Sequence, residues 1–274
     1  MENYSDHKIC IPVELIRYVI REKFGKAFAL FIYLKCHSSG KVHEDSPLFL
    51  SAPTMLGIKD QRTFHSYLSK LQGLNWVGYN ARSRYYFIRG FDFIRKSLHL
   101  KSRKAAIFDH REIDLFANGF LQGVLICEKI KAQQYYWEVS PRRQAKFATK
   151  TLGVANQNFP ASDASRPPYY GLSNKAIAEL LNCKMTRACE LKQQAESGGY
   201  LRTKKHFEVI ARLPKPDFMI KKTIAANHPE LGKRVRFRAR RIRKQTVIEV
   251  LRQLHDEILP QIGFKNIKRF IKIK

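Results

Sequence analysis

The stretch that decides the fold is residues 50–88, LSAPTMLGIKDQRTFHSYLSKLQGLNWVGYNARSRYYFI. Ser51 and Asp60 are side chains that commonly cap helix N-termini, and each precedes a run with helical spacing. The second run places an apolar stripe on one face, formed by Phe64, Leu68 and Leu71. After Gly73 the pattern changes to two extended apolar segments around a basic turn, 80–84. The stretch predicts a short helix, a turn, a longer helix and a β-hairpin.

The segments before this stretch extend the same unit. Residues 12–33 have helical apolar spacing interrupted at Gly25, and the apolar run 48–50 predicts a short strand. We therefore expect a first domain over residues 1–100.

A second stretch, residues 172–210, repeats the pattern of the first at an offset of 122 to 124 residues. Leu50-Ser51 aligns with Leu172-Ser173, and Phe64, Leu71 and Trp76 align with Ala188, Ala195 and Tyr200. Upstream, helical spacing over 108–133 predicts a leading helix. These features predict a second domain over residues 101–212, with a Pro-rich loop at 140–168.

The polar faces of the two longer predicted helices are candidate DNA-reading surfaces. Arginine suits bidentate contacts to guanine and glutamine to adenine, each contributing about 1–3 kcal/mol of discrimination. The candidate readers are Gln61, Arg62, His65, Ser66 and Ser69 in the first unit and Lys184, Thr186, Arg187, Glu190 and Gln193 in the second. A solvated helix face is the alternative interpretation.

Basic hairpin turns follow both helices. We expect a second hairpin with strands at 200–201 and 206–211, and phosphate contacts from Arg82, Arg84, Arg202, Lys204 and Lys205. Such contacts add affinity and salt dependence with little sequence information. A hairpin kept soluble by its charge is the alternative.

The C-terminal segment, residues 213–274, is expected to be a basic helical extension. Residues 231–274 hold fourteen Lys or Arg and three acids, and Val247, Leu251, Leu254 and Ile258 have helical spacing. The basic arm that precedes this helix consists of Arg236, Arg238, Arg240, Arg241, Arg243 and Lys244. An arm that orders on DNA, an RNA site and the charged end of a helix remain open.

Composition narrows the functional classes. The 274 residues contain 51 Lys or Arg and 23 Asp or Glu, which gives a net charge of +28 and favours an anionic partner such as nucleic acid. The longest apolar run, 27–34, is too short to span a membrane, and the N-terminus lacks a signal-peptide pattern, so we expect a cytoplasmic protein without a membrane partner. The five cysteines form no CxxC pair, and phosphate-loop, HExxH and GxSxG motifs are absent. No cofactor, metal or catalytic activity is expected.

The order of the elements resembles tandem winged-helix domains, which are helix-turn-helix variants. Two such domains joined by a loop and followed by a basic region resemble the replication-initiator family of plasmids and phages. The resemblance covers residues of about 10–212 and rests on element order and the internal repeat. It implies a mainly α protein of the α+β class that binds repeated double-stranded DNA sites, recruits host replication or transcription proteins and changes between monomer and homodimer.

The sequence therefore predicts sequence-specific duplex DNA binding by a replication initiator or transcriptional regulator. Two alternatives remain open: a nonspecific nucleic-acid-coating or packaging protein, for which total charge suffices, and an RNA-binding accessory protein.

Overall fold

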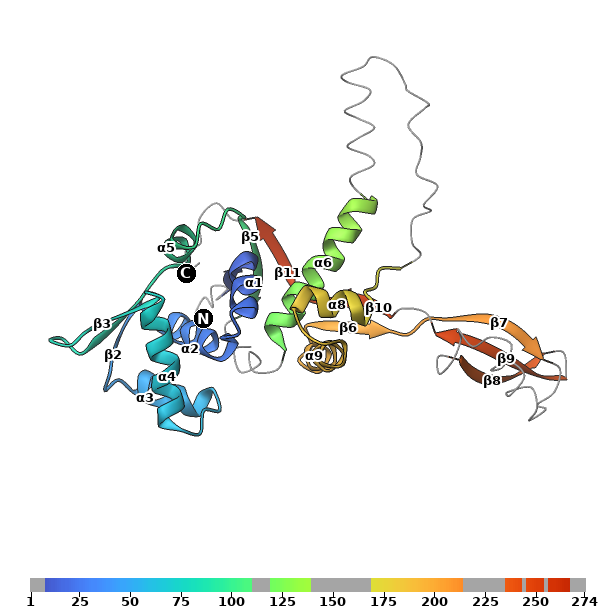
Figure 1. The fold of residues 1–274 in the computed structure, drawn as a ribbon, viewed down its shortest axis with the longest axis horizontal. Coiled ribbons are helices and arrows are strands. Elements are labelled where there is room, and N and C mark those ends of the chain that lie inside the picture. The colour runs from blue at the N-terminus through green and yellow to red at the C-terminus, as the bar shows by residue number, and fades with distance from the viewer. Residues whose placement is uncertain are drawn as a thin grey trace, which may run out of the picture.

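The computed structural model describes residues 8–109, 119–138, 169–213, 235–242, 245–253 and 256–266 (Figure 1). Within these residues the protein is mixed α and β, with helices packed beside small antiparallel sheets. This agrees with the α+β class expected from the sequence.

The first unit contains four helices before its hairpin, with strand β2 between the second and the third. Its elements are β1 (Lys8–Pro12), α1 (Val13–Arg21), α2 (Gly25–His37), β2 (Lys41–His43), α3 (Pro47–Met55), α4 (Gln61–Gly73), β3 (Val77–Asn80), β4 (Tyr85–Ile88), α5 (Phe91–Ser97) and β5 (Lys104–Asp109). Strand β4 lies between β2 and β3 in an antiparallel sheet. Helices α2, α3 and α4 pack on one side of that sheet.

The described part of the second unit has three helices before its first strand. Its elements are α6 (Phe120–Glu138), α8 (Asn174–Leu181), α9 (Met185–Ser197), β6 (Leu201–Lys204), β7 (Phe207–Leu213), β8 (Val235–Ile242), β9 (Gln245–Gln253), β10 (Glu257–Pro260) and β11 (Gly263–Asn266). Helices α6, α8 and α9 contact one another, and β6 pairs with β10.

A third sheet joins the two units through segments far apart in the sequence. Strand β5 lies between β1 and β11, so residues 263–266 pair with the strand that ends the first unit. In Figure 1 this sheet stands between α1 and α6. Strand β11 therefore links the second unit to the first through backbone pairing with β5.

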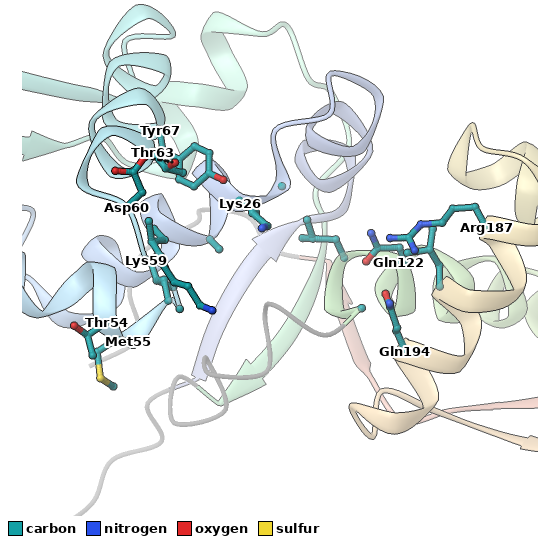
Figure 2. Close-up of a pocket in the computed structure, with 18 residues that line it drawn as sticks. Lys26, Thr54, Met55, Lys59, Asp60, Thr63, Tyr67, Gln122, Arg187 and Gln194 are labelled. Carbon is teal, nitrogen blue, oxygen red and sulfur yellow. Dashed lines mark hydrogen bonds between the residues drawn. The ribbon is translucent and has the colours of Figure 1, made fainter.

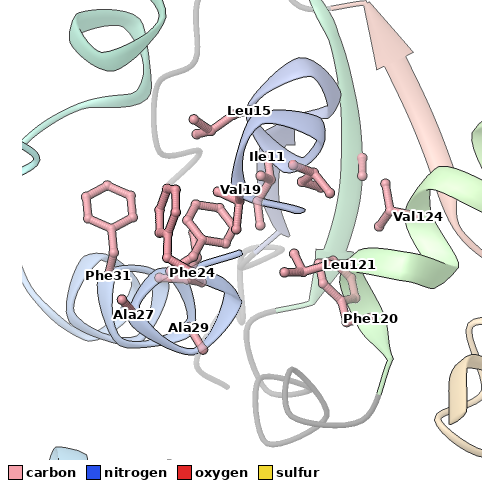
Figure 3. Close-up of a cluster of buried hydrophobic side chains, with 14 of the residues drawn as sticks. Ile11, Leu15, Val19, Phe24, Ala27, Ala29, Phe31, Phe120, Leu121 and Val124 are labelled. Carbon is pink, nitrogen blue, oxygen red and sulfur yellow. The ribbon is translucent and has the colours of Figure 1, made fainter. Parts of the chain in front are cut away.

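Hydrophobic packing and buried charge hold α1 and α2 against α6. Leu121 and Val124 of α6 belong to the same buried cluster as Val19 and Phe24 (Figure 3). The carboxylate of Glu128, 12% exposed, accepts hydrogen bonds from Arg17 at 2.5 Å and from Lys104 at 3.0 Å. Two cations thus compensate the charge of this carboxylate between the units.

Backbone hydrogen bonds establish which positions of the two units correspond. Trp76 N donates to Leu71 O at 2.9 Å, and Tyr200 N donates to Ala195 O at 3.0 Å. The residues before these donors, Asn75 and Gly199, both have positive φ. The offset of 124 residues from α4 to α9 that the sequence predicted is confirmed by this geometry.

The predicted alignment of the shorter helices is wrong. Residues 48–50 lie within α3 instead of forming a strand, and Ser46, not Ser51, accepts the capping hydrogen bond from Phe49 N. Pro47 directly after Ser46 explains this start, because proline is favoured in the first helical turn. In the second unit Ser173 caps α8 as predicted, so the caps are offset by 127 residues rather than 122.

The leading helix of the second unit is shorter than expected. It begins at Phe120, whereas residues 108 and 109 belong to β5. Gly119, with φ +87°, permits a close approach to α9, because a Cβ there would lie 2.6 Å from Ala195 N. The predicted 140–168 loop lies outside the described residues.

The predicted C-terminal helix is wrong. Residues 245–253 form β9 and residues 257–260 form β10. The spacing of Val247, Leu251 and Ile258 fits a helix, but these residues lie in strands. The β-branched residues Thr246, Val247, Ile248 and Val250 favour a strand, and pairing on both sides with β7 and β8 fixes it. Two strands beyond residue 213 join earlier sheets: β10 pairs with β6, and β11 pairs with β5.

The second hairpin is also built differently from the prediction. Strands β6 and β7 do not pair with each other; β6 pairs with β10 and β7 pairs with β9. Residues 202–205 lack the Gly, Asn or Asp residues that a tight hairpin turn needs, so the chain continues outward. In Figure 1 the sheet β7–β9–β8 extends away from the helices of this unit.

Candidate nucleic-acid interface

Helix α4 presents a polar face to solvent because its apolar residues are buried in the core. The Asp60 carboxylate accepts from Arg62 N at 3.1 Å and caps the helix. Phe64, Leu68 and Leu71 are buried. The predicted readers Gln61, Arg62, His65, Ser66 and Ser69 are all exposed. Gln61 and His65 lie within 3.3 Å of each other through their side-chain nitrogens.

Helix α9 has the same division into buried and exposed faces. Ala188, Leu191 and Ala195 are buried. The predicted readers Lys184, Thr186, Arg187, Glu190 and Gln193 are all exposed. Arg187 pairs with Glu190 at 2.6 Å, and both side chains are more than half exposed. Solvent screening makes such a pair weak, so it would yield readily to a charged ligand.

The offset of 124 residues relates the exposed positions of the two helices in pairs. Arg62 corresponds to Thr186, Ser66 to Glu190 and Ser69 to Gln193. The paired positions correspond in place along the helix, but their side chains differ in charge and hydrogen-bonding groups. If both helices read DNA, they therefore read different sequences.

A cleft separates α4 from α9, with a volume of about 760 Å³ (Figure 2). Thr63 and Tyr67 of α4 line one side, and their counterparts Arg187 and Leu191 line the other. A second cleft of about 740 Å³ shares Tyr67 and Arg187 with the first and is also lined by Ser66. Equivalent positions therefore face a common space, as they would about a local two-fold axis.

The sequence interpretation missed several residues of this cleft. Lys26 at the start of α2 and Lys59 in the turn before α4 are exposed and line it together with Gln194. Figure 2 shows the nitrogen ends of Lys26, Lys59 and Arg187 directed into the space between the units. Asp60, the acid that lines the same cleft, is engaged in capping α4. Lys26 lies on another helix from the predicted readers, so no local pattern pointed to it.

Arg84 in the first hairpin is less available for phosphate contacts than the sequence predicted, because acidic side chains bind it. Its guanidinium donates to Glu44 and forms an ion pair with Asp45 at 2.9 Å. The Tyr79 hydroxyl donates to Glu44 at 2.6 Å, and these two hydrogen bonds, Tyr79 first and Arg84 second, lower the pKa of Glu44. Arg82 is exposed at the tip. The acidic pair 44–45 thus organises the base of the turn.

Arg202, Lys204 and Lys205 of the second unit lie where β6 leads toward the sheet β7–β9–β8, not at a hairpin tip. All three are exposed, and Lys204 lies 4.0 Å from Glu257. His206 contacts the same carboxylate at 2.8 Å and stacks on Tyr169 with ring centroids 4.1 Å apart. These contacts fix the point where β6 leads into β7.

The residues expected to form a basic arm lie mainly in strand β8. Arg236, Arg238, Arg240 and Arg241 occupy this strand, which pairs with β9 at the edge of the outer sheet. Arg238 contacts the fully buried carboxylate of Glu249 at 2.6 Å, so it has a structural role. Arg243 and Lys244 lie outside the described residues.

Within the described parts of the chain, no three His, Cys, Asp or Glu residues gather as metal ligands would. No helix among these residues combines the length and the apolar character of a membrane span. Comparisons with protein-family models, curated proteins and solved structures found no match.

Proposed function

We propose that the protein binds double-stranded DNA through two winged-helix units, with α4 and α9 as its recognition helices. One observation carries the proposal: equivalent positions of the two helices line one basic cleft, and each helix is preceded by a short capped helix and followed by a strand of an antiparallel pair. An α-helix fits the major groove of B-DNA, so exposed polar residues of α4 and α9 would meet base edges.

The β3–β4 hairpin of the first unit and the β6–β10 pair of the second would supply the wings of this arrangement. Arg82 in the first unit and Arg202 and Lys205 in the second are exposed cations that would contact phosphates. The net charge of +28 supports tight, salt-dependent association with duplex. Replication initiation or transcriptional regulation, with host replication or transcription proteins as further partners, is the role we propose for such a protein. The proposal includes a cytoplasmic location and no catalysis.

A nonspecific coating function is the second candidate, and the outer sheet of the second unit favours it. Strand β8 carries four arginines among eight residues and lies away from the helices, where charge alone would bind nucleic acid (Figure 1). Under this function the exposed faces of α4 and α9 would carry no sequence information.

Alanine substitution on a duplex retained from a random pool separates the two functions. We expect Arg62→Ala to weaken binding to that duplex roughly tenfold, within the range of one bidentate contact, and to change binding to its shuffled sequence only slightly. Lys129→Ala, which removes an exposed charge from α6, is the matched control. Equal losses on both duplexes for both variants would reject sequence reading and leave coating.

A further inference from the structure

The sheet β2–β4–β3 has an outer face that no part of the proposed duplex interface uses. The inner face carries Val42, Val77 and Tyr86, which are buried against the helices. The register places Lys41 and Gly78 on either side of Phe87, and His43 beside Tyr85. Successive side chains of a strand point to opposite faces, so these residues lie on the outer face. We call Lys41, His43, Tyr85, Phe87, Arg89 and Phe93 the outer wing face.

An exposed phenylalanine lies at the centre of this face. Phe87 is 40% exposed although it occupies the middle strand, where neighbours on both sides normally cover a side chain. One of those neighbours is Gly78, which has no side chain to cover the ring. Glycine within a strand marks a bulge, a tight bend or a place where a ligand or another backbone approaches closely. Phe93 at the start of α5 is also 42% exposed.

Cations accompany the aromatic rings. Lys41 Nζ lies 5.7 Å from the centroid of the Tyr85 ring, and the Arg89 guanidinium lies 5.0 Å from that of Phe93. Phe87 and Arg89 are two residues apart, so the face continues from β4 toward α5. None of the residues on it is acidic. The nearest acids along the chain are all in ion pairs: Glu44 and Asp45 with Arg84, and Asp92, which precedes Phe93, with Arg95 at 3.4 Å.

We propose that the outer wing face binds single-stranded DNA. Unpaired bases stack on aromatic side chains, and flanking cations neutralise the phosphates between them, a combination typical of single-strand sites. Bases within a duplex are already stacked on each other, so these rings would add little stacking energy to the binding of duplex DNA. The choice of DNA over RNA rests on the proposed function, because a strand separated near a bound duplex is DNA.

The two sites can be occupied together because they lie on different sides of the sheet. The buried rings of Phe49 and Phe64 connect α3 and α4 to Tyr86 on the inner face, with Phe49 and Tyr86 stacked at 4.7 Å. The outer wing face lies on the opposite side. A chain with its helices on duplex would still present Phe87 to a single strand.

The test is fluorescence polarisation of the full chain with labelled oligothymidine and, in parallel, with the selected duplex. We expect Phe87→Ala to weaken oligothymidine binding roughly tenfold, within the range measured for loss of one stacked base, and to change duplex binding less than twofold. Phe87→Tyr should retain binding because it keeps the ring. Tyr135→Ala, which removes a 47% exposed ring from α6, should leave both affinities unchanged.

The outcomes separate this proposal from the proposed function. Arg62→Ala should show the reverse pattern, with loss on duplex and little change on oligothymidine. If Phe87→Ala leaves oligothymidine binding unchanged while Arg62→Ala still weakens duplex, the single-strand site is rejected and duplex reading stands. If Arg62→Ala has no selective effect but Phe87→Ala does, duplex reading fails and the single-strand site stands. If the chain prefers oligouridine and Phe87→Ala abolishes that preference, the occupant is RNA and the assignment to DNA is overturned.

Discussion

The two units share the helical exit into their first strand and differ in the strands that follow, which are the wings of the proposed function. In the first unit residues 81–84 connect β3 directly to β4, whereas in the second unit residues 205–256 separate β6 from its partner β10 and include the sheet β7–β9–β8. The hydrogen bonds that end α4 and α9 nevertheless correspond residue by residue. The helices and their exit into the first strand are therefore the constant part, and the wing is the part that varies.

The cores of the units differ in the size of their side chains as well. Trp76 is fully buried and packs against Phe24, Phe28 and Phe31 at centroid distances of 5.4 to 6.0 Å. Its counterpart Tyr200 contacts Phe120 at 5.1 Å, while a Cβ on Gly123 would lie 2.8 Å from Tyr200 Cβ. The first unit fills its interior with large rings, and the second brings its helices closer together through small residues.

The largest expected effect tests this difference in packing. Trp76→Ala should lower the free energy of unfolding by about 3–5 kcal/mol, because it removes a fully buried ring from an aromatic cluster. Tyr200→Phe is the comparison in the second unit and should change stability by less than about 1.5 kcal/mol, since the ring remains. Urea denaturation followed by circular dichroism measures both. A loss below about 1 kcal/mol for Trp76→Ala would contradict the packing of the first unit.

The second prediction removes the difference between the wings. Deleting residues 207–254 leaves Lys205, His206, His255 and Asp256 as a four-residue connection between β6 and β10, the length of the first turn. The deletion removes thirteen basic and four acidic residues, so the net charge falls from +28 to +19. Retaining Asp256 keeps its 2.7 Å ion pair with the buried Lys192.

We expect this deletion to reduce the salt dependence of duplex binding and to leave sequence preference intact. Each phosphate contact that is lost lowers the slope of log K against log salt by about 0.9, so several lost contacts would be plain in a salt titration. An unchanged slope would show that the outer sheet does not contact DNA. A changed preferred sequence would show that the sheet reads bases.

The third prediction uses cysteines as probes of burial in the two units. Cys127 lies in α6 and is buried, and burial raises the pKa of its thiol to about 11. Because the thiolate is the reactive form, Cys127 should resist iodoacetamide at pH 8, as should the buried Cys10 and Cys36. Cys183, which lines the second cleft, should be alkylated sooner and protected by duplex. Mass spectrometry of digested protein measures each site, and fast labelling of Cys127 would contradict the α6 packing.

The smallest expected effect concerns the base of the first wing. Hydrogen bonds from Tyr79 and Arg84 lower the pKa of Glu44, so its ionised form stabilises the folded hairpin. That contribution is present above the unfolded pKa of about 4.3 and is lost as the pH falls through the lower folded value. Glu44→Gln should remove this acid dependence of the melting temperature and strengthen duplex binding a few-fold by releasing Arg84. A variant with unchanged duplex affinity would show that Arg84 does not reach phosphate.

The sequence predicted the repeated helices well because their signals are local. Asp60 and Ser173 cap helices as expected, and Phe64, Leu68 and Leu71 are buried as their spacing indicated. The exposed faces of α4 and α9 follow from the same periodicity, so their candidate readers were found without a structure.

The sequence could not reveal pairings between distant segments. Residues 245–253 and 257–260 have apolar spacing that fits a helix, and pairing with β6, β7 and β8 makes them strands. Lys26 and Lys59 reach the cleft because α6 packs on α1 and α2, an arrangement set by long-range burial. The engagement of Arg84 by Glu44 joins residues forty positions apart.

The most direct test of two-helix reading is selection from a random duplex pool, at near-physiological salt with excess competitor, repeated for Arg62→Ala and for Gln193→Ala. The account predicts a motif with two half-sites, in which Arg62→Ala relaxes preference in one half-site and Gln193→Ala in the other. A motif altered at the same positions by both variants, or no motif despite tight binding, would contradict it.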